Sequence, residues 1–173
     1  MEGLDRGGRT VRVPLPGRRA VTTTAGVLAV VVAVAAVVVH LVVVRPAQQI
    51  EQARTDGLAA ARTLTEQVLS YQPASRDADL ARARGLVTGD FGRQFGTVLD
   101  SVVGPALDRG VGTRTTVTRA GVVDARPDRV TTLLYLTQDA SRGSDDKRTT
   151  VGRAEVIVEF VDGRWLVSDL RNF

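Results

Sequence analysis

Residues 26–44 read GVLAVVVAVAAVVVHLVVV, a run that lies within the 25 positions 20–44, none of which carries a formal charge when His40 is neutral. As an α-helix this 19-residue run spans ~28 Å, close to the ~30 Å hydrocarbon thickness of a bilayer. It lacks the polar face that a helix on a soluble core would show. In lipid every backbone amide must be bonded internally, and a lone segment achieves this only as a helix. The sequence therefore predicts a transmembrane helix over residues 20–45.

A cleaved signal peptide is the alternative interpretation of this segment. Signal peptides have an apolar region of about 7–15 residues, followed by a cleavage site of small residues. The run here is longer, and it ends in Val44-Arg45-Pro46 with no Ala-x-Ala site after it. We therefore expect an uncleaved anchor.

The charges on either side of the span predict its orientation. Residues 1–19 contain five arginines and two acidic residues, whereas residues 45–173 contain 18 basic and 17 acidic residues. The positive-inside rule places the arginine-bearing arm, 1–19, in the cytoplasm and the rest of the chain outside it. Because the large segment is nearly neutral and has no basic stripe, the formal net charge of +4 does not indicate nucleic-acid binding. We expect a single-pass protein of the cell (inner/plasma) membrane.

Small side chains recur on one face of the predicted span, and such a stripe lets a second helix approach closely. An alanine-rich span also produces such stripes by chance, so both interpretations stay open. His40 lies near the outer end of the span, where it faces a partner helix or reaches the interface. A proton relay would need further ionisable groups in the span. The residues of this possible helix–helix contact are Ala25, Ala29, Ala33, Ala36 and His40.

The residue inventory excludes several kinds of chemistry. The chain has no cysteine and one histidine, and aromatic residues make up 4% of it. The absence of cysteine excludes a disulfide scaffold, a thiolate metal site and a cysteine nucleophile. A single histidine excludes ligation of a metal by a histidine pair and argues against a Ser-His-Asp triad. We find no phosphate-binding glycine loop and no Gly-x-Ser-x-Gly motif. The sequence predicts no catalytic, cofactor-binding or metal-binding residues, and therefore a protein that is not an enzyme.

Helical periodicity continues beyond the span. Apolar residues at three- and four-residue spacing predict a helix over 46–71, within a stalk of residues 46–75 that leads into a folded domain. Ser75 is the expected N-cap of a short second helix that ends near Gly85, and Thr88 of a third that ends at 110–112. The expected buried stripe of the third helix is Phe91, Phe95, Val98, Leu99, Val102 and Val103.

The pattern then changes to period two, which is typical of strands. Strands are expected over 113–123, 129–138, 149–161 and 165–170, with a tight turn at Val161-Asp162-Gly163-Arg164. Three helices followed by four sequential antiparallel strands predict an α+β domain over residues 76–173, with a curved sheet wrapped over the helices.

A few polar or aromatic residues could carry chemistry, but each has a simpler structural interpretation. The adjacent carboxylates Asp145 and Asp146 could bind a cation, although they are more typical of a solvated hairpin tip. Asp90 could be a catalytic carboxylate, but its place favours stabilisation of a helix N-terminus. Glu155 and Glu159, on the strand face that also carries Arg153, could form a carboxylate pair or lie on a wet sheet face.

Three aromatic residues complete the candidates. Trp165, the only indole, could stack on a ligand, but it is expected to close the core or the mouth of the domain. Tyr71 and Tyr135 are the only phenols that could act as an acid or a hydrogen-bond donor in a pocket.

The order of these parts resembles a known family. The basic arm, span and stalk are followed by Thr88-Gly89-Asp90-Phe91, Ala120-Gly121-Val122-Val123, the strand Val130 to Gln138, and a terminal VDGRWLVSDL at 161–170. Over residues 20–173 the chain resembles the actinobacterial mammalian-cell-entry (Mce)-associated membrane proteins, including their orphaned members. The resemblance implies a nuclear-transport-factor-2-like, cystatin-like cone, related to the periplasmic domain of type IV secretion scaffold proteins. It also implies a non-catalytic accessory that stabilises or assembles an Mce lipid-import complex in the cell envelope.

Two other functions stay open at this point. A secretion-type or divisome-type assembly protein would use the same domain with other partners. A membrane-tethered isomerase or steroid-binding cone would need a carboxylate, and a donor such as Tyr135, pointing into an apolar cavity.

Overall fold

The computed structural model describes residues 31–143 and 146–173. The chain divides into two compact units, Met1–Val44 and Arg45–Phe173. In the described part of the first unit, residues 31–39 are α-helical and η1 (His40–Val44) is a π-helical turn. Residues 31–42 are all exposed. Among the described residues, one helix is long and apolar enough to cross a membrane; it runs from Val31 to Val68.

The possible helix–helix contact is described only in part. Ala25 and Ala29 lie outside the described residues, and Ala33, Ala36 and His40 are exposed on the helix. This contact stays a prediction.

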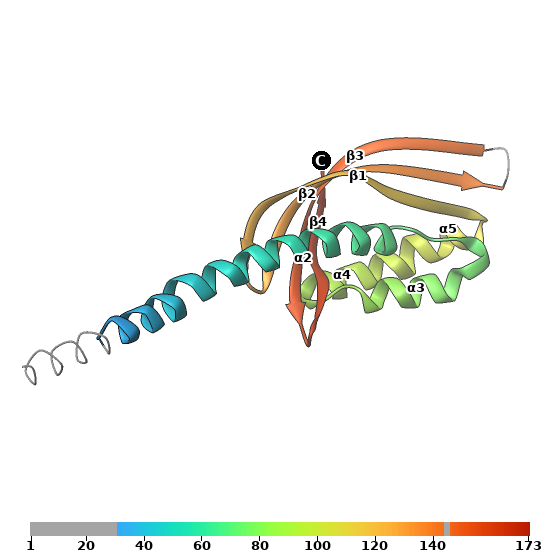
Figure 1. The fold of residues 1–173 in the computed structure, drawn as a ribbon. Coiled ribbons are helices and arrows are strands. Elements are labelled where there is room, and N and C mark those ends of the chain that lie inside the picture. The colour runs from blue at the N-terminus through green and yellow to red at the C-terminus, as the bar shows by residue number, and fades with distance from the viewer. Residues whose placement is uncertain (1–30, 144–145) are drawn as a thin grey trace, which may run out of the picture. The chain divides into compact units, whose positions relative to one another are not determined.

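The second unit contains helices followed by a four-stranded meander (Figure 1). The sheet order is β1-β2-β3-β4, and every neighbouring pair is antiparallel. An apolar N-terminal helix and helices on a curved antiparallel sheet confirm the predicted α+β architecture. The elements are α2 (Arg45–Val68), η2 (Pro73–Ser75), α3 (Arg76–Gly85), α4 (Gly89–Val98), η3 (Leu99–Val103), α5 (Gly104–Asp108), β1 (Val111–Arg126), β2 (Arg129–Arg142), β3 (Asp146–Val161) and β4 (Arg164–Asn172).

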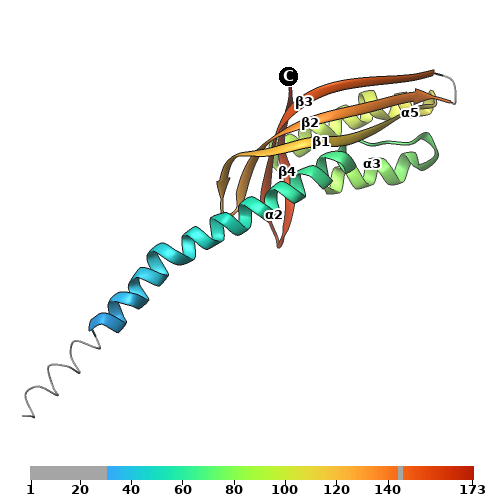
Figure 2. The same cartoon turned by 45° about the horizontal axis from the view of Figure 1, so that its top comes forward.

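Helix α2 packs along the sheet and supplies the centre of the core (Figure 2). Its buried residues are almost all small and recur at helical spacing, so the helix backbone lies close to the strands. The closest approach is at Gly57, where an added Cβ would lie 2.5 Å from a Val130 methyl group. Residues 46–75, the predicted stalk, and the sheet lie in one compact unit, Arg45–Phe173. The buried residues of α2 are Ala53, Gly57, Ala61, Thr65 and Val68.

The inner face of the sheet completes this core. The predicted alternation in β3 is present in part, because Ala154, Val156 and Val158 are fully buried. Phe160, expected on the same face, is 47% exposed because it lies at the end of the strand, where it packs edge-to-face on Trp165. Ile157, expected on the other face, is also buried, at the point where the pairing of β3 with β4 shifts register.

Helices α3 to α5 form a second, smaller cluster around Leu80, Leu99 and Leu107. The expected stripe of the third helix is partly wrong. Val98 and Val102 are 44% and 58% exposed, whereas Leu99 is fully buried. The reason is that η3 is a π-helical turn, whose wider i→i+5 spacing breaks the 3.6-residue period on which the prediction relied.

Three local predictions also need correction. Helix α2 ends at Val68, before Tyr71, because Tyr71 exchanges two backbone hydrogen bonds of 2.8 Å with Thr113 at the start of β1. Neither Ser75 nor Thr88 makes a side-chain capping bond. Ser75 instead donates its hydroxyl hydrogen bond to Asp79, and the backbone N–H of Thr88 donates to the carbonyl of Val167.

Candidate functional site

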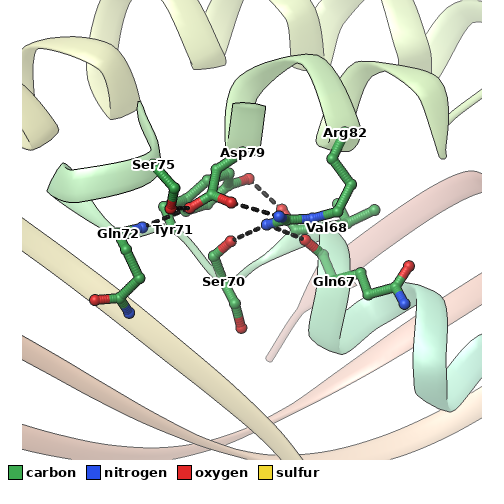
Figure 3. A network of polar contacts seen from close by, with 8 residues as sticks. All are labelled: Gln67, Val68, Ser70, Tyr71, Gln72, Ser75, Asp79 and Arg82. Carbon is green, nitrogen blue, oxygen red and sulfur yellow. Dashed lines mark hydrogen bonds and ion pairs between the residues drawn. The ribbon is translucent and has the colours of Figure 1, made fainter. Parts of the chain in front are cut away.

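The most buried charged side chain among the described residues is that of Asp79, on α3, which is 5% exposed (Figure 3). Its Oδ2 accepts hydrogen bonds from the backbone N–H of Gln72, at 2.7 Å, and from the Ser75 hydroxyl, at 2.8 Å. Its Oδ1 accepts from the guanidinium of Arg82, one helical turn further along α3. The carboxylate therefore holds the connection between α2 and α3 in place.

Arg82 extends this network back to α2. Its Nη2 donates to the carbonyl of Ser70, at 2.8 Å, while its buried Nε has no hydrogen-bond partner among the described residues. Carbonyl groups near a helix C-terminus lack intrahelical partners and carry partial negative charge, so a guanidinium is favoured there. We call Asp79, Arg82, Ser75, Ser70 and Gln72 the Asp79 network.

The pKa shifts agree with a structural role for this network. Burial alone would raise the pKa of Asp79, but the hydrogen bonds from Gln72 and Ser75 and the contact with Arg82 outweigh it and lower that pKa. Burial raises the pKa of the Tyr71 phenol far above its usual value, and the hydroxyl donates to the carbonyl of Val68. A carboxylate that stays ionised and a phenol that stays neutral, both already bonded, are poorly suited to proton transfer near pH 7.

Sequence reasoning found Tyr71 but missed Asp79 and Arg82. The available signal was local: Ser75, Asp79 and Arg82 share one face of a helix at four- and three-residue spacing. Of this pattern only Ser75 carries a predicted role, as an N-cap, and the burial of Asp79 beside the end of α2 is a tertiary feature that this spacing does not show.

A cavity of about 590 Å³ lies between the start of α4 and residues of β2, β3 and β4. Asp90 and Glu159, considered separately from sequence, line the same cavity, together with Asp169. Each of these carboxylates pairs with an arginine: Asp90 with Arg93, Glu159 with Arg129, and Asp169 with Arg171. The charges of the cavity thus compensate one another. Its remaining lining residues are Gly89, Phe91, Gln94 and Ser168.

A second cavity, of about 280 Å³, lies beside Trp165. Trp165 is partly buried against the core and packs edge-to-face on Phe160, with ring centroids 5.3 Å apart. Both rings also line this cavity, opposite Gln49, Gln52, Ala53 and Asp56 of α2. Neither cavity is lined by Asp79 or Tyr71.

The remaining candidates do not come together. Tyr135 is 44% exposed because Leu134 and Leu136, its neighbours in β2, face the core and a strand alternates its side chains. Tyr135 therefore does not supply the inward-pointing donor that the isomerase or steroid-binding alternative requires. Glu155 is half-buried on the same outer sheet face as the exposed Arg153.

The acidic pair at the β2–β3 hairpin is described only in part. Asp145 lies outside the described residues, and Asp146 begins β3. Within residues 31–143 and 146–173, no group of three or more His, Cys, Asp or Glu residues is arranged to hold a metal ion.

Comparison with solved structures defines the class of protein as one with a nuclear-transport-factor-2-like, cystatin-like domain. An IcmL-like type IV secretion system protein from Legionella pneumophila superposes with a TM-score of 0.60 at 7% identity, covering 69% of this chain and 91% of that one. Agrobacterium tumefaciens VirB8 gives 0.57 at 10% identity, covering 70% and 92%. An NTF2-like protein with a cystatin-like fold from Novosphingobium aromaticivorans gives 0.51 at 12% identity, covering 75% and 86%. At these identities the likeness shows the fold.

Sequence relatives are more specific. The chain is 32% identical over 117 residues to the outer membrane protein Rv1973 of Mycobacterium tuberculosis, covering 67% of this chain and 73% of that protein. It belongs to the same family as Rv1973, and it is a membrane protein with an apolar N-terminal helix. The uncharacterized protein Rv1362c of the same organism is 32% identical over 127 residues, covering 72% of this chain and 58% of that protein. No protein-family model matches the chain.

Proposed function

We propose that this chain is a non-catalytic scaffold, anchored in the membrane, that stabilises or assembles an Mce-type lipid-import complex in the cell envelope. The observation that carries the proposal is the Asp79 network. The most buried carboxylate of the described domain, that of Asp79, accepts hydrogen bonds only from groups that connect α2 to α3. A domain that uses its buried acid in this way is suited to presenting a rigid surface to other proteins. The Mce-specific part rests on the family resemblance of the motifs at residues 88–91 and 161–170.

We further propose that the protein lies in the cytoplasmic membrane, with its N-terminus inside and its domain outside. The five arginines of residues 1–19 support this orientation. The relative Rv1973 is named an outer membrane protein, so fractionation has to precede the topology test. Protease added to intact spheroplasts should degrade residues 45–173 and spare the N-terminal arm. Protection of the domain would reverse the orientation, and recovery in the outer-membrane fraction would reject the location.

Co-purification tests the proposed partners. The full-length, tagged chain is solubilised from membranes of a cell that contains an Mce transporter, and the transporter subunits are quantified. A matched control replaces residues 20–45 with an unrelated membrane span, which keeps the anchor but removes the small-residue face. We expect transporter subunits to co-purify with the full-length chain and to decrease with the replaced span if Ala33 and Ala36 contact a partner helix.

Deletion of residues 1–45 tests the anchor itself. We expect a soluble, folded fragment that fails to support the envelope complex in cells. Full activity of this fragment would show that membrane anchoring is dispensable and would contradict the proposal.

The other candidate is a scaffold of a different envelope assembly, such as a type IV secretion-like machine. Co-purification of secretion subunits in place of lipid-transport subunits would assign the chain to that assembly. Turnover of a steroid or another small molecule by the purified protein would contradict both proposals.

A further inference from the structure

One part of the sheet edge, the N-terminal part of β3, has no strand paired along its outer side among the described residues. Strand β4 pairs with β3 only as far as Ala154 and Asn172, and the N–H of Phe173 then donates to the carbonyl of Arg153, at 3.0 Å. Strand β3 extends seven residues further, to Asp146, and pairs there only with β2 among the described residues. In both views this part of β3 runs past β4 with no described element along its outer side (Figures 1 and 2).

The direction of the free backbone groups follows from the bond to Phe173. Because the carbonyl of Arg153 faces the β4 side, the backbone groups of every second residue before it face the same way. These are Val151, Thr149 and Lys147, and all three residues are exposed. Val151, at 72%, is more exposed than any other large apolar residue of the domain that the structure describes. The edge therefore offers three N–H and three C=O groups around one apolar side chain.

The other edges of the sheet are closed by hydrogen bonds or made irregular. The start of β1 is closed by α2 and the residues after it. The N–H of Thr113 donates to Tyr71, that of Thr115 to the Ser70 hydroxyl, and that of Val117 to the Glu66 carboxylate. The rest of β1 contains two register shifts, and such irregularities disturb an edge and twist it away from partners. Strand β4 is closed at Val167, which exchanges bonds with Leu86 and Thr88.

The charge of the open edge selects its partner. Residues 146–153 carry three basic residues, Lys147, Arg148 and Arg153, and one acidic residue, Asp146, at the far end of the strand. A second copy pairing antiparallel about Thr150 would place Lys147 opposite Arg153 on both sides of the centre, with six basic residues along the paired stretch. Like charges facing each other across strands destabilise a sheet. An extended segment that carries acidic residues gains the same backbone bonds and adds charge complementarity.

We propose that β3 from Lys147 to Arg153 is a docking edge where an acidic, extended segment of a partner protein adds a fifth strand to the sheet. The new strand continues the line of β4 and pairs with Val151, Thr149 and Lys147 through its backbone. This inference goes beyond the proposed function and does not depend on the identity of the envelope complex.

The test uses the full chain in nanodiscs of neutral phosphatidylcholine. The probe is a capped heptapeptide of alternating glutamate and valine, and the control is its lysine counterpart. Hydrogen exchange of residues 147–153 is measured as either peptide is titrated to millimolar concentration. We expect the acidic peptide to slow exchange at Thr149 and Val151, and the basic peptide to bind about tenfold more weakly or not at all.

Three variants test where the peptide binds and what selects its charge. Val151→Pro removes one outward N–H without breaking a bond to β2, whereas Val151→Thr keeps both the N–H and the branched shape. The first should weaken binding of the acidic peptide by about tenfold, and the second should bind as the wild type does. Slow exchange at Thr150 and Gly152, whose N–H groups face β2, checks that Val151→Pro is folded. The double variant Lys147→Glu with Arg153→Glu should reverse the charge preference, so that the basic peptide binds more tightly than the acidic one.

Four results would overturn the proposal. The first is no protection by the acidic peptide, and the second is equal protection by peptides of either charge. The third is protection that rises with protein concentration without peptide, because the occupant would then be a second copy. The fourth is protection in phosphatidylglycerol nanodiscs without peptide, because the edge would then lie against anionic lipid.

Discussion

Gly57 provides a sharp test of how α2 meets the sheet. A Cβ at this position would lie 2.5 Å from the Val130 Cγ2 and 2.9 Å from its Cβ, and Val130 is fully buried. Alanine in a helix interior is favoured over glycine by about 1 kcal/mol. Overpacking a core costs about 1–3 kcal/mol, and the cost here lies at the upper end because α2 and β2 must move apart. Gly57→Ala should therefore lower the free energy of unfolding by about 2 kcal/mol, although the same change at a solvent-exposed helix position is stabilising.

The matched control is Gly96→Ala, in α4. An added Cβ at Gly96 meets nothing within 4 Å, so this change should raise the free energy of unfolding by about 1 kcal/mol. For a unit of this size 1 kcal/mol corresponds to about 4 °C in Tm. The two variants should therefore differ by about 12 °C, and the full chain in detergent can be followed by the near-ultraviolet circular dichroism of Trp165.

A double variant then isolates the contact. Val130→Ala removes the atoms that the new methyl group meets, so Gly57→Ala combined with Val130→Ala should lose at least about 1 kcal/mol less than the sum of the single losses. If Gly57→Ala were as stable as Gly96→Ala, or if the cycle showed no coupling, α2 and β2 would not be as close as described.

Four further predictions concern buried polar groups. Asp79→Asn should lower the free energy of unfolding by about 2 kcal/mol, measured in urea at pH 7, because it weakens the pairing with Arg82. The pKa of Asp79 is lower in the folded state than in the unfolded state, so its carboxylate stabilises the fold above the usual carboxyl pKa range. This stabilisation is lost as the pH falls through the folded-state pKa. The Asp79→Asn variant should therefore show a smaller decrease in Tm below about pH 4 than the wild type. Tyr71→Phe should cost about 1 kcal/mol and, because the phenol pKa is raised on folding, should remove part of the destabilisation above pH 10. Thr65→Val should raise the free energy of unfolding by about 1 kcal/mol, because the buried Thr65 hydroxyl has no partner among the described residues; an unchanged or lower Tm would contradict this.

The sequence predicted those parts of the fold in which local periodicity and tertiary packing agree. Helix α3 and the four strands fall where hydrophobic spacing and turn residues indicated, because side-chain alternation is imposed by the strand backbone itself. The same alternation could have predicted that Tyr135 faces outward, because its neighbours Leu134 and Leu136 face the core.

The parts that failed depend on distant contacts. Helix α2 stops at Val68 because Tyr71 pairs with Thr113, 42 positions further along the chain. The π-helical turn at Leu99–Val103 has no recognised signature in composition, yet it exposes Val98 and Val102. The Asp79 network shows the same limit for the candidate site. The spacing of Ser75, Asp79 and Arg82 is local, but burial of the carboxylate depends on the end of α2.

The pairing of β4 with the chain before α4 has a consequence for how the protein is made. Thr88 and Val167 are hydrogen-bonded although they are 79 positions apart. At ~5–20 residues per second, a ribosome needs about 4–16 s to synthesise the intervening segment. During that interval Leu86 and Thr88 lack their strand partner, and the part of the core that β4 covers stays exposed. The nascent chain is therefore a partly folded intermediate with exposed apolar surface for several seconds. Chaperones that bind nascent chains should act on it in that interval.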